Sequence, residues 1–368
     1  MGFVLSEEEL SIQATARRVV DAHGGPAVLR RLRDERDPLG IAGELWGALR
    51  ALGLVGLALP EAEGGAGLGL KEVGLVAEEL GRTLSPAPLG AHTVAARLVA
   101  RRAGSSLARE LTPSLCDGSR LATLAHEEGV RHEARPRAVT LSRRGSGYAL
   151  DGDKSFVPFG GAADWLVVSA AHEGGAALVL VELARAEIMS LCTIDSHGAA
   201  RARFRGLEVA ADAVLTTDAE AELGRALDEA TLLLTAEMLG GAWEAFRRTV
   251  EYLKQRRQFG VPIGSFQALK HRAASMYCDL ELSRAVVREG LSVADGAQGS
   301  LAELASAAKA RLSDTYVHVT NEAVQLHGGV GVTDELDLGF FMKRARVTEQ
   351  LMGDAAFHRD RYARLLGY

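Results

Sequence analysis

The sequence predicts an α+β protein that is mainly helical: a helical N-terminal unit, a small middle β unit and a C-terminal four-helix bundle. At both ends of the chain, apolar residues recur at three- and four-residue intervals, which is typical of amphipathic helices. Between them, short β-rich runs alternate with turn residues, which is typical of strands. The chain has 368 residues, enough for two or three packed units.

The N-terminal domain, which we place at residues 1–118, is predicted to be α-helical. Ser6 and Glu9 have the spacing of a capping box at the start of a first helix. Further on, the string "KEVGLVAEELGRTL" has helical spacing through Val73, Val76 and Leu80.

A β domain follows, which we place at residues 119–220 and expect to be a small barrel or sandwich. The string "GYALDGDKSF" predicts two strands joined by a turn at Asp151 and Gly152. The runs "DWLVVSAA" and "AALVLVELA" predict further strands, so we expect a mostly antiparallel domain.

Four long helices with short joints are predicted for residues 221–368, which is the arrangement of a four-helix bundle. The first helix has an apolar stripe that runs from Leu232 to Leu253. Ser265 is in position to cap the second helix. A third helix begins near Leu301, and a fourth follows Leu336.

Composition narrows the range of functions. The formal net charge of −6 argues against a general nucleic-acid binder. The cysteines Cys116, Cys192 and Cys278 lie far apart without metal-binding spacing, which predicts no metal site and fits a reducing compartment. Neither a signal peptide nor a membrane-spanning run is recognisable. We therefore expect a cytoplasmic protein with no nucleic-acid or membrane partner.

Two strings carry features that a plain helix end does not need. The string "YLKQRRQFGVPIGSFQ", residues 252–267, places two arginines and a phenylalanine where one helix stops and the next begins, which suits a flat anionic ligand. The string "QLHGGVG" places Gly328 and Gly329 where a ligand could approach the backbone closely. The structural alternatives are arginines that meet a helix dipole and a glycine C-cap.

These strings, together with the order of the domains, resemble the acyl-CoA dehydrogenase family over nearly the whole chain. Residues 52–82 look like the family's N-terminal signature, and residues 147–168 look like its β-domain hairpin. The resemblance implies FAD-dependent α,β-desaturation of an acyl-CoA thioester, with an electron-transfer flavoprotein as the electron acceptor. It also implies that seven residues contact the FAD of a neighbouring subunit: Arg256, Phe259, Phe266, Gln267, Gln325, Gly328 and Gly329.

The resemblance leaves the catalytic residue unknown. Ala230 and Met352 occupy the two positions at which the family carries its glutamate base, and neither side chain can accept a proton. Glu229 and Glu349 lie close to these positions in the sequence. We expect both to be solvated or salt-bridged acids at the surface.

The β domain departs from the family as well. His126, Glu127 and Glu128 stand where the family has small polar donors to the flavin ring and the substrate. Pro158, which has neither a hydroxyl nor an N–H group, stands where the family has a threonine that donates to the ring. A homo-oligomer would repeat this defect in every site.

The resemblance therefore points to a hetero-oligomer, such as a heterotetramer, in which this chain completes the FAD site of a second acyl-CoA dehydrogenase-like subunit. Some steroid side-chain enzymes of actinobacteria are similar to this arrangement. One alternative is an autonomous, homo-oligomeric FAD enzyme with a displaced base, Glu229 or Glu349. The other is a non-enzymatic scaffold that keeps the fold and binds only a protein. A flavin absorbance spectrum distinguishes the two.

Overall fold

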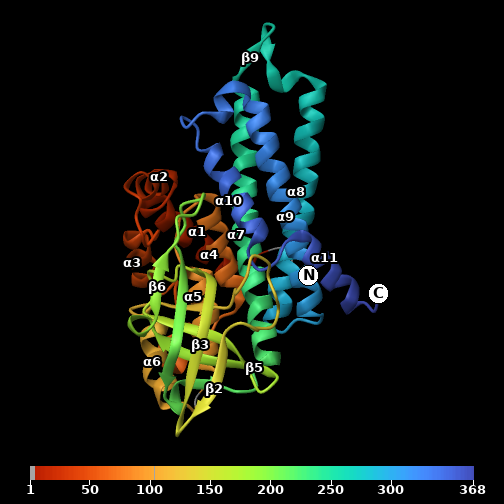
Figure 1. The fold of residues 1–368 in the computed structure, drawn as a ribbon. Coiled ribbons are helices and arrows are strands. Elements are labelled where there is room, and N and C mark those ends of the chain that lie inside the picture. Colours follow the sequence, from red (N-terminus) through yellow and green to blue (C-terminus); the bar gives the residue numbers. More distant parts are fainter. Residues whose placement is uncertain (1–4, 103) are drawn as a thin grey trace. The chain divides into compact units, whose positions relative to one another are not determined.

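The computed structural model describes residues 5–102 and 104–368 (Figure 1). Helices dominate it and one larger β-sheet accompanies them, which confirms the predicted α+β, mainly helical fold. The chain falls into two compact units. One combines the chain up to Ala27 with Gly74–Ser85 and Thr231–Tyr368, and the other combines Val28–Val73 with Pro86–Ala230. The three-domain division at residues 118 and 220 stays a prediction.

Helices fill the N-terminal part of the chain as predicted. The capping box at the start of α1 is present, because the Ser6 hydroxyl accepts from the Glu9 amide at 3.1 Å while the Ser6 amide donates to the Glu9 carboxylate at 2.8 Å. The helices are α1 (Glu7–His23), α2 (Pro26–Glu35), α3 (Gly43–Ala51), α4 (Leu70–Arg82), α5 (Leu89–Ala100) and α6 (Ser106–Cys116).

In the described part of the chain, strands β1 to β8 form one sheet in the order β6-β7-β3-β2-β4-β5-β8, with β1 beside β4. The β1–β4 and β2–β4 pairs are parallel, and the other pairs are antiparallel. The strands are β1 (Ala122–Ala125), β2 (Thr140–Arg144), β3 (Gly147–Pro158), β4 (Trp165–His172), β5 (Gly175–Glu182), β6 (Glu187–Ser190), β7 (Ala199–Val209) and β8 (Val214–Thr216).

The turn predicted at Asp151 and Gly152 is wrong. Strand β3 continues through both residues. The turn between β2 and β3 lies earlier, at Gly145 and Ser146. Gly152, with φ 125°, lies where the pairing between β3 and β7 shifts register. Partners on both edges of β3 outweigh the local turn preference of an Asp-Gly pair.

The C-terminal part is a helical bundle in which α9 packs against α8, α10 and α11. The predicted fourth helix is two helices, α10 and α11, because Met352 and Gly353 adopt positive φ between them. Ser265 does not cap α8: it ends a short 3₁₀ turn, and its hydroxyl donates to the Pro262 carbonyl at 2.7 Å. The helices are α7 (Glu220–Gln255), α8 (Gln267–Ala294), α9 (Leu301–His327), α10 (Leu338–Gln350) and α11 (Ala355–Leu365).

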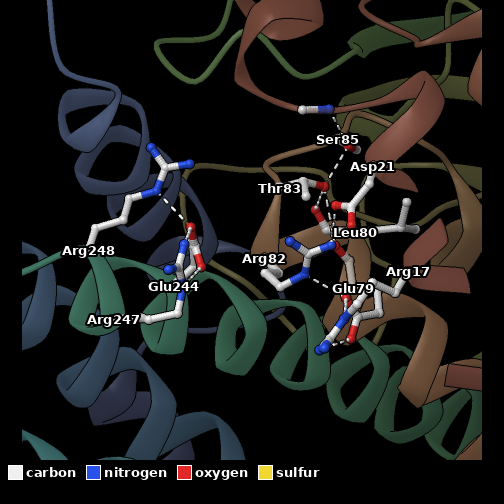
Figure 2. A network of polar contacts seen from close by, with 11 residues as sticks. Arg17, Asp21, Glu79, Leu80, Arg82, Thr83, Ser85, Glu244, Arg247 and Arg248 are labelled. Carbon is white, nitrogen blue, oxygen red and sulfur yellow. Dashed lines mark hydrogen bonds and ion pairs between the residues drawn. The ribbon is translucent and has the colours of Figure 1, made fainter. Parts of the chain in front are cut away.

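Ion pairs around the buried Glu79 carboxylate join α1 to α4 (Figure 2). The Glu79 carboxylate on α4 accepts from Arg17 of α1 at 2.8 Å and from Arg82 at 2.6 Å. Arg82 also binds Asp21 of α1. Because removing one member of such a network leaves a buried charge without compensation, the network fixes the pairing of α1 with α4. None of the described helices is long and apolar enough to cross a membrane.

Candidate functional site

A β-hairpin follows α7, where the sequence indicated a simple corner between two helices. Strand β9 (Arg257–Gln258) pairs antiparallel with β10 (Val261–Pro262), and Phe259 and Gly260 form the turn with φ 53° and 81°. Two positive φ values are typical of a type I′ turn, which matches the twist of the paired strands. Figure 1 shows the hairpin projecting at the end of α7 and α8.

The side chains of this hairpin are available to an external partner. Phe259 is 91% exposed, and its ring meets that of Phe266 edge-on at 6.1 Å between centroids. The guanidinium groups of Arg256 and Arg257 make no hydrogen bond or ion pair with residues 5–102 or 104–368. No contact therefore supports the alternative in which these arginines cap the last carbonyl groups of α7. Gln267, the first residue of α8, is also exposed.

The second predicted segment meets the root of the hairpin. His327, at the end of α9, stacks on Tyr252 of α7 with ring centroids 4.2 Å apart. Its Nδ1 bonds the Ala323 carbonyl, and burial lowers the pKa of the ring, so His327 is a packing residue. Gln325, Gly328 and Gly329 are exposed. The structure thus brings together the ends of the two segments that the sequence assigns to one FAD site.

The glycines after His327 have different local roles. Gly328 needs to be glycine because its φ of 65° and ψ of −145° suit few other residues. Gly329 does not have a positive φ, and a Cβ added there would meet no atom within 4 Å. Nothing in the described chain explains the glycine at 329, which is consistent with close approach by another molecule.

The β unit is closed by its own polar network around His126. The His126 Nε2 lies 2.7 Å from the Glu133 carbonyl, so this nitrogen carries the proton and Nδ1 accepts from the Ser169 hydroxyl at 2.9 Å. Lys154 donates to the same hydroxyl at 3.1 Å. Burial and the nearby Lys154 charge lower the pKa of His126 to about 4, so the imidazole is neutral and fully bonded at neutral pH.

Glu127 and Glu128, the two carboxylates beside His126, each have a partner within the β unit. Burial raises the pKa of Glu128, but the charge of Lys154, 2.8 Å away, and the amides of residues 137 and 138 outweigh this and hold the pKa below its usual range. Burial in turn lowers the pKa of Lys154 to about 8, against the pull of Glu128. Glu127 contacts His132 at 2.7 Å.

Two donors beside the positions that the resemblance assigns to the flavin ring are used inside the chain. The Ser155 amide donates to the Glu127 carbonyl at 2.8 Å, and the Thr123 hydroxyl donates to the Pro158 carbonyl at 2.8 Å. Pro158 itself has no N–H group. This side therefore does not fit a flavin ring, whereas the hairpin offers an unpaired guanidinium that fits an anionic dinucleotide.

Neither carboxylate near the two family base positions is poised as a base. Glu229 is fully buried, so the expectation of a surface acid is wrong, although it is salt-bridged to Arg97 at 3.2 Å and Arg101 at 3.0 Å. Burial raises the pKa of Glu229, but these arginines outweigh it and hold the pKa below its usual range. Glu349 pairs with Arg346 at 3.2 Å, as expected for a salt-bridged acid.

Sequence reasoning missed Lys309, a buried lysine on α9. Its ammonium donates to the Glu349 carbonyl at 2.9 Å, the Gly353 carbonyl at 2.7 Å and the Ser313 hydroxyl at 3.1 Å. It thereby holds the loop that contains Met352 from within. The only sign in the sequence was a lysine among apolar residues of a helix. Sequence alone does not show whether such a lysine is buried or exposed to solvent. Tyr252, one turn before Arg256, was also missed, because its contact with His327 joins distant parts of the chain.

Comparisons with known proteins show the family of the chain. Models of the N-terminal and C-terminal domains of acyl-CoA dehydrogenase match residues 6–119 and 223–367. Acyl-CoA dehydrogenase IpdE2 of Mycobacterium tuberculosis is 33% identical over 351 residues, which cover 94% of this chain and 93% of the relative. A variant of the Tcur3481–Tcur3483 steroid ACAD has a TM-score of 0.87 and 32% identity over 98% of both chains. The ChsE4–ChsE5 complex from Mycobacterium tuberculosis has a TM-score of 0.87 and 29% identity, over 100% of this chain and 99% of that chain.

Proposed function

Because the chain belongs to the acyl-CoA dehydrogenase family of FAD-dependent oxidoreductases, we propose that it is one subunit of a hetero-oligomeric acyl-CoA dehydrogenase. In this role it completes the FAD site of a second, related subunit. One observation carries the proposal: the hairpin exposes an unpaired Arg256 beside Phe259, while the β unit uses its own donors around His126 and Pro158.

On this proposal the chain holds the dinucleotide end of the partner's FAD. Arg256 donates to the pyrophosphate, since a planar guanidinium fits two anionic oxygens. Phe259 and Phe266 pack near the adenosine part, where an exposed aromatic pair gains most from being covered. Gly329 allows the cofactor near the backbone. Gln267, Gln325 and Gly328 complete the contact.

Proton removal from the acyl thioester falls to the partner, because this chain presents no free base at either family position. Ala230 and Met352 carry no acceptor, and Glu229 is bonded to arginines. Bound FAD supplies the hydride acceptor, and an electron-transfer flavoprotein is the expected oxidant. Two of the similar structures, a steroid ACAD and the ChsE4–ChsE5 complex, support a steroid-type acyl-CoA and a heteromeric assembly.

Co-purification tests the proposal. The tagged chain is expressed with a candidate second acyl-CoA dehydrogenase-like chain, and the eluate is analysed for composition, mass and flavin absorbance. We expect both chains to elute together with fewer flavins than chains. A yellow homo-oligomer with one flavin per chain would favour the autonomous enzyme. A protein that stays colourless with every candidate partner would favour the scaffold.

A further inference from the structure

An excess of guanidinium groups surrounds Glu229, within one of the two compact units. Arg97 of α5, Arg101 directly after α5 and Arg225 of α7 all bond this carboxylate, at 3.2, 3.0 and 2.9 Å. Asp228, the neighbouring residue, is also buried. Three guanidinium groups thus share the one carboxylate of Glu229.

Arg97 and Arg101 also line a pocket of about 270 Å³. The Arg101 side chain is 32% exposed, and only its Nη2 bonds a described residue, so its remaining N–H groups are available. The rest of the lining is largely apolar and includes Leu59, Pro60 and Leu68 of the preceding loop and Ala100 beside Arg101. The pocket thus pairs a charged end with an aliphatic side.

The apolar wall is held in place before any ligand arrives. Three backbone bonds close the loop on itself: the Ala66 amide to the Gly56 carbonyl at 3.0 Å, and the Gly67 and Leu68 amides to the carbonyls of residues 59 and 57 at 2.9 and 2.8 Å. Arg97 adds a bond to the Ala58 carbonyl at 3.0 Å. A preformed wall lowers the ordering cost of binding.

We infer that this pocket binds a small anion in which a carboxylate or phosphate head is carried on a short aliphatic stem. The planar fork of Arg101 matches such a head, and the pocket is large enough for a stem of a few carbons. The stem lies against Leu59 and Leu68. The site is separate from the hairpin and does not depend on FAD, so its test is independent of the proposed function.

Isothermal titration of the full chain in phosphate-free buffer tests the inference, with hexanoate, butyl phosphate, inorganic phosphate and uncharged hexanol as probes. We expect hexanoate or butyl phosphate to bind and hexanol not to bind. Binding of only one of the two assigns the head group. Binding of inorganic phosphate alone would overturn the aliphatic part of the inference, and binding of no probe would overturn all of it.

Variants locate the site. Arg101→Gln should raise the dissociation constant of the probe by roughly tenfold or more, because a charged hydrogen bond is lost. Arg120→Gln is the matched control, because Arg120 is an exposed arginine that pairs with Asp164 at 2.8 Å and does not line this pocket. The affinity of this variant for the probe should equal that of wild type. Equal affinity in the two variants would overturn the inference.

A second variant keeps the test decisive if Arg101→Gln does not fold. Ala100→Glu places a carboxylate on the pocket wall, and it should abolish probe binding while the chain still melts cooperatively. Unchanged binding in a folded Ala100→Glu variant would overturn the inference.

Discussion

Tyr252 and His327 stack with their ring centroids 4.2 Å apart, and the Tyr252 hydroxyl donates to the His327 carbonyl at 3.2 Å. Tyr252 lies one helical turn before Arg256, and His327 lies immediately before Gly328. This contact joins the ends of α7 and α9, so that the arginine and the glycine loop occupy one end of the bundle. A ligand that touches one segment can therefore reach the other.

Arg256→Ala should weaken FAD retention in the assembled complex. A bidentate charged contact is worth about 1.5–3 kcal/mol, so the FAD dissociation constant should rise roughly ten- to hundredfold. Arg256→Lys should restore part of the loss, because an ammonium keeps the charge but lacks the planar fork. Fluorescence titration of FAD into apo complexes measures both.

The control for Arg256 is its neighbour. Arg257 is the first residue of β9. It is also exposed and also unpaired within the described chain, so Arg257→Ala removes the same charge one position away. We expect it to change FAD affinity much less. If the two alanine variants bind FAD equally well, Arg256 is not a pyrophosphate contact.

The adjacent glycines offer a second matched pair. Gly329→Ala should leave the stability of the isolated chain within about 0.5 kcal/mol, because the new Cβ meets no atom within 4 Å, yet it should weaken FAD in the complex. Gly328→Ala should instead lower the free energy of unfolding by about 1–3 kcal/mol, because of its φ of 65° and ψ of −145°. Denaturant unfolding and FAD titration separate the effects. A Gly329→Ala complex with wild-type flavin affinity would argue against close approach of a ligand there.

Glu229→Gln should cost stability rather than catalysis. The change leaves three guanidinium groups without their buried carboxylate, which should lower the free energy of unfolding by about 3–5 kcal/mol. Turnover per folded complex should stay within a few-fold. Glu349→Gln, which breaks one ion pair to Arg346, should change stability by less than about 1 kcal/mol and turnover equally little. A loss of about a hundredfold in turnover for either variant, with the fold intact, would identify a general base in this chain.

Lys309 should make the free energy of unfolding change with pH in the neutral to alkaline range. Burial lowers the pKa of Lys309 to about 7 from its ordinary 10.5, against the pull of Glu349 and Asp354. Between these two values the unfolded chain binds a proton that the folded chain does not, so the free energy of unfolding rises with pH. The unfolding free energy of wild type minus that of Lys309→Met should therefore increase with pH across this range, by at most about 1.4 kcal/mol per pH unit.

Urea unfolding of both proteins at several pH values between 7 and 10 measures this gap. Lys154, whose pKa is about 8, titrates in the same range but is present in both proteins, so its effect cancels in the difference. A gap that stays constant with pH would show that Lys309 keeps its proton when folded.

Features with a local signal were predicted from the sequence. The capping box at Ser6 needs only two side chains three residues apart, and the long apolar periods of α7, α8 and α9 exceed any competing pattern. The resemblance assigned the hairpin residues, but not the hairpin. Its strands are two residues each, too short to show alternation, and Phe259-Gly260 is not one of the residue pairs typical of a two-residue hairpin turn.

Features set by distant partners were not predicted. Glu229 can be buried because Arg97 and Arg101, more than a hundred positions earlier, reach it from the C-terminal end of α5. The turn placed at Asp151 and Gly152 failed for the same reason, since β7 pairs with that part of β3 from far along the chain. Local propensity is outweighed wherever tertiary contacts fix the register.

The flavin content of the isolated chain is the most direct test of the proposed division of labour between subunits. The full chain is purified alone, incubated with excess FAD, desalted and examined by absorbance for flavin per polypeptide. Because the donors around His126 and Pro158 are used within the β unit, we predict that the desalted chain retains little or no flavin, and that flavin is retained once the partner is added. One tightly held FAD per chain in the absence of any partner would contradict the proposal.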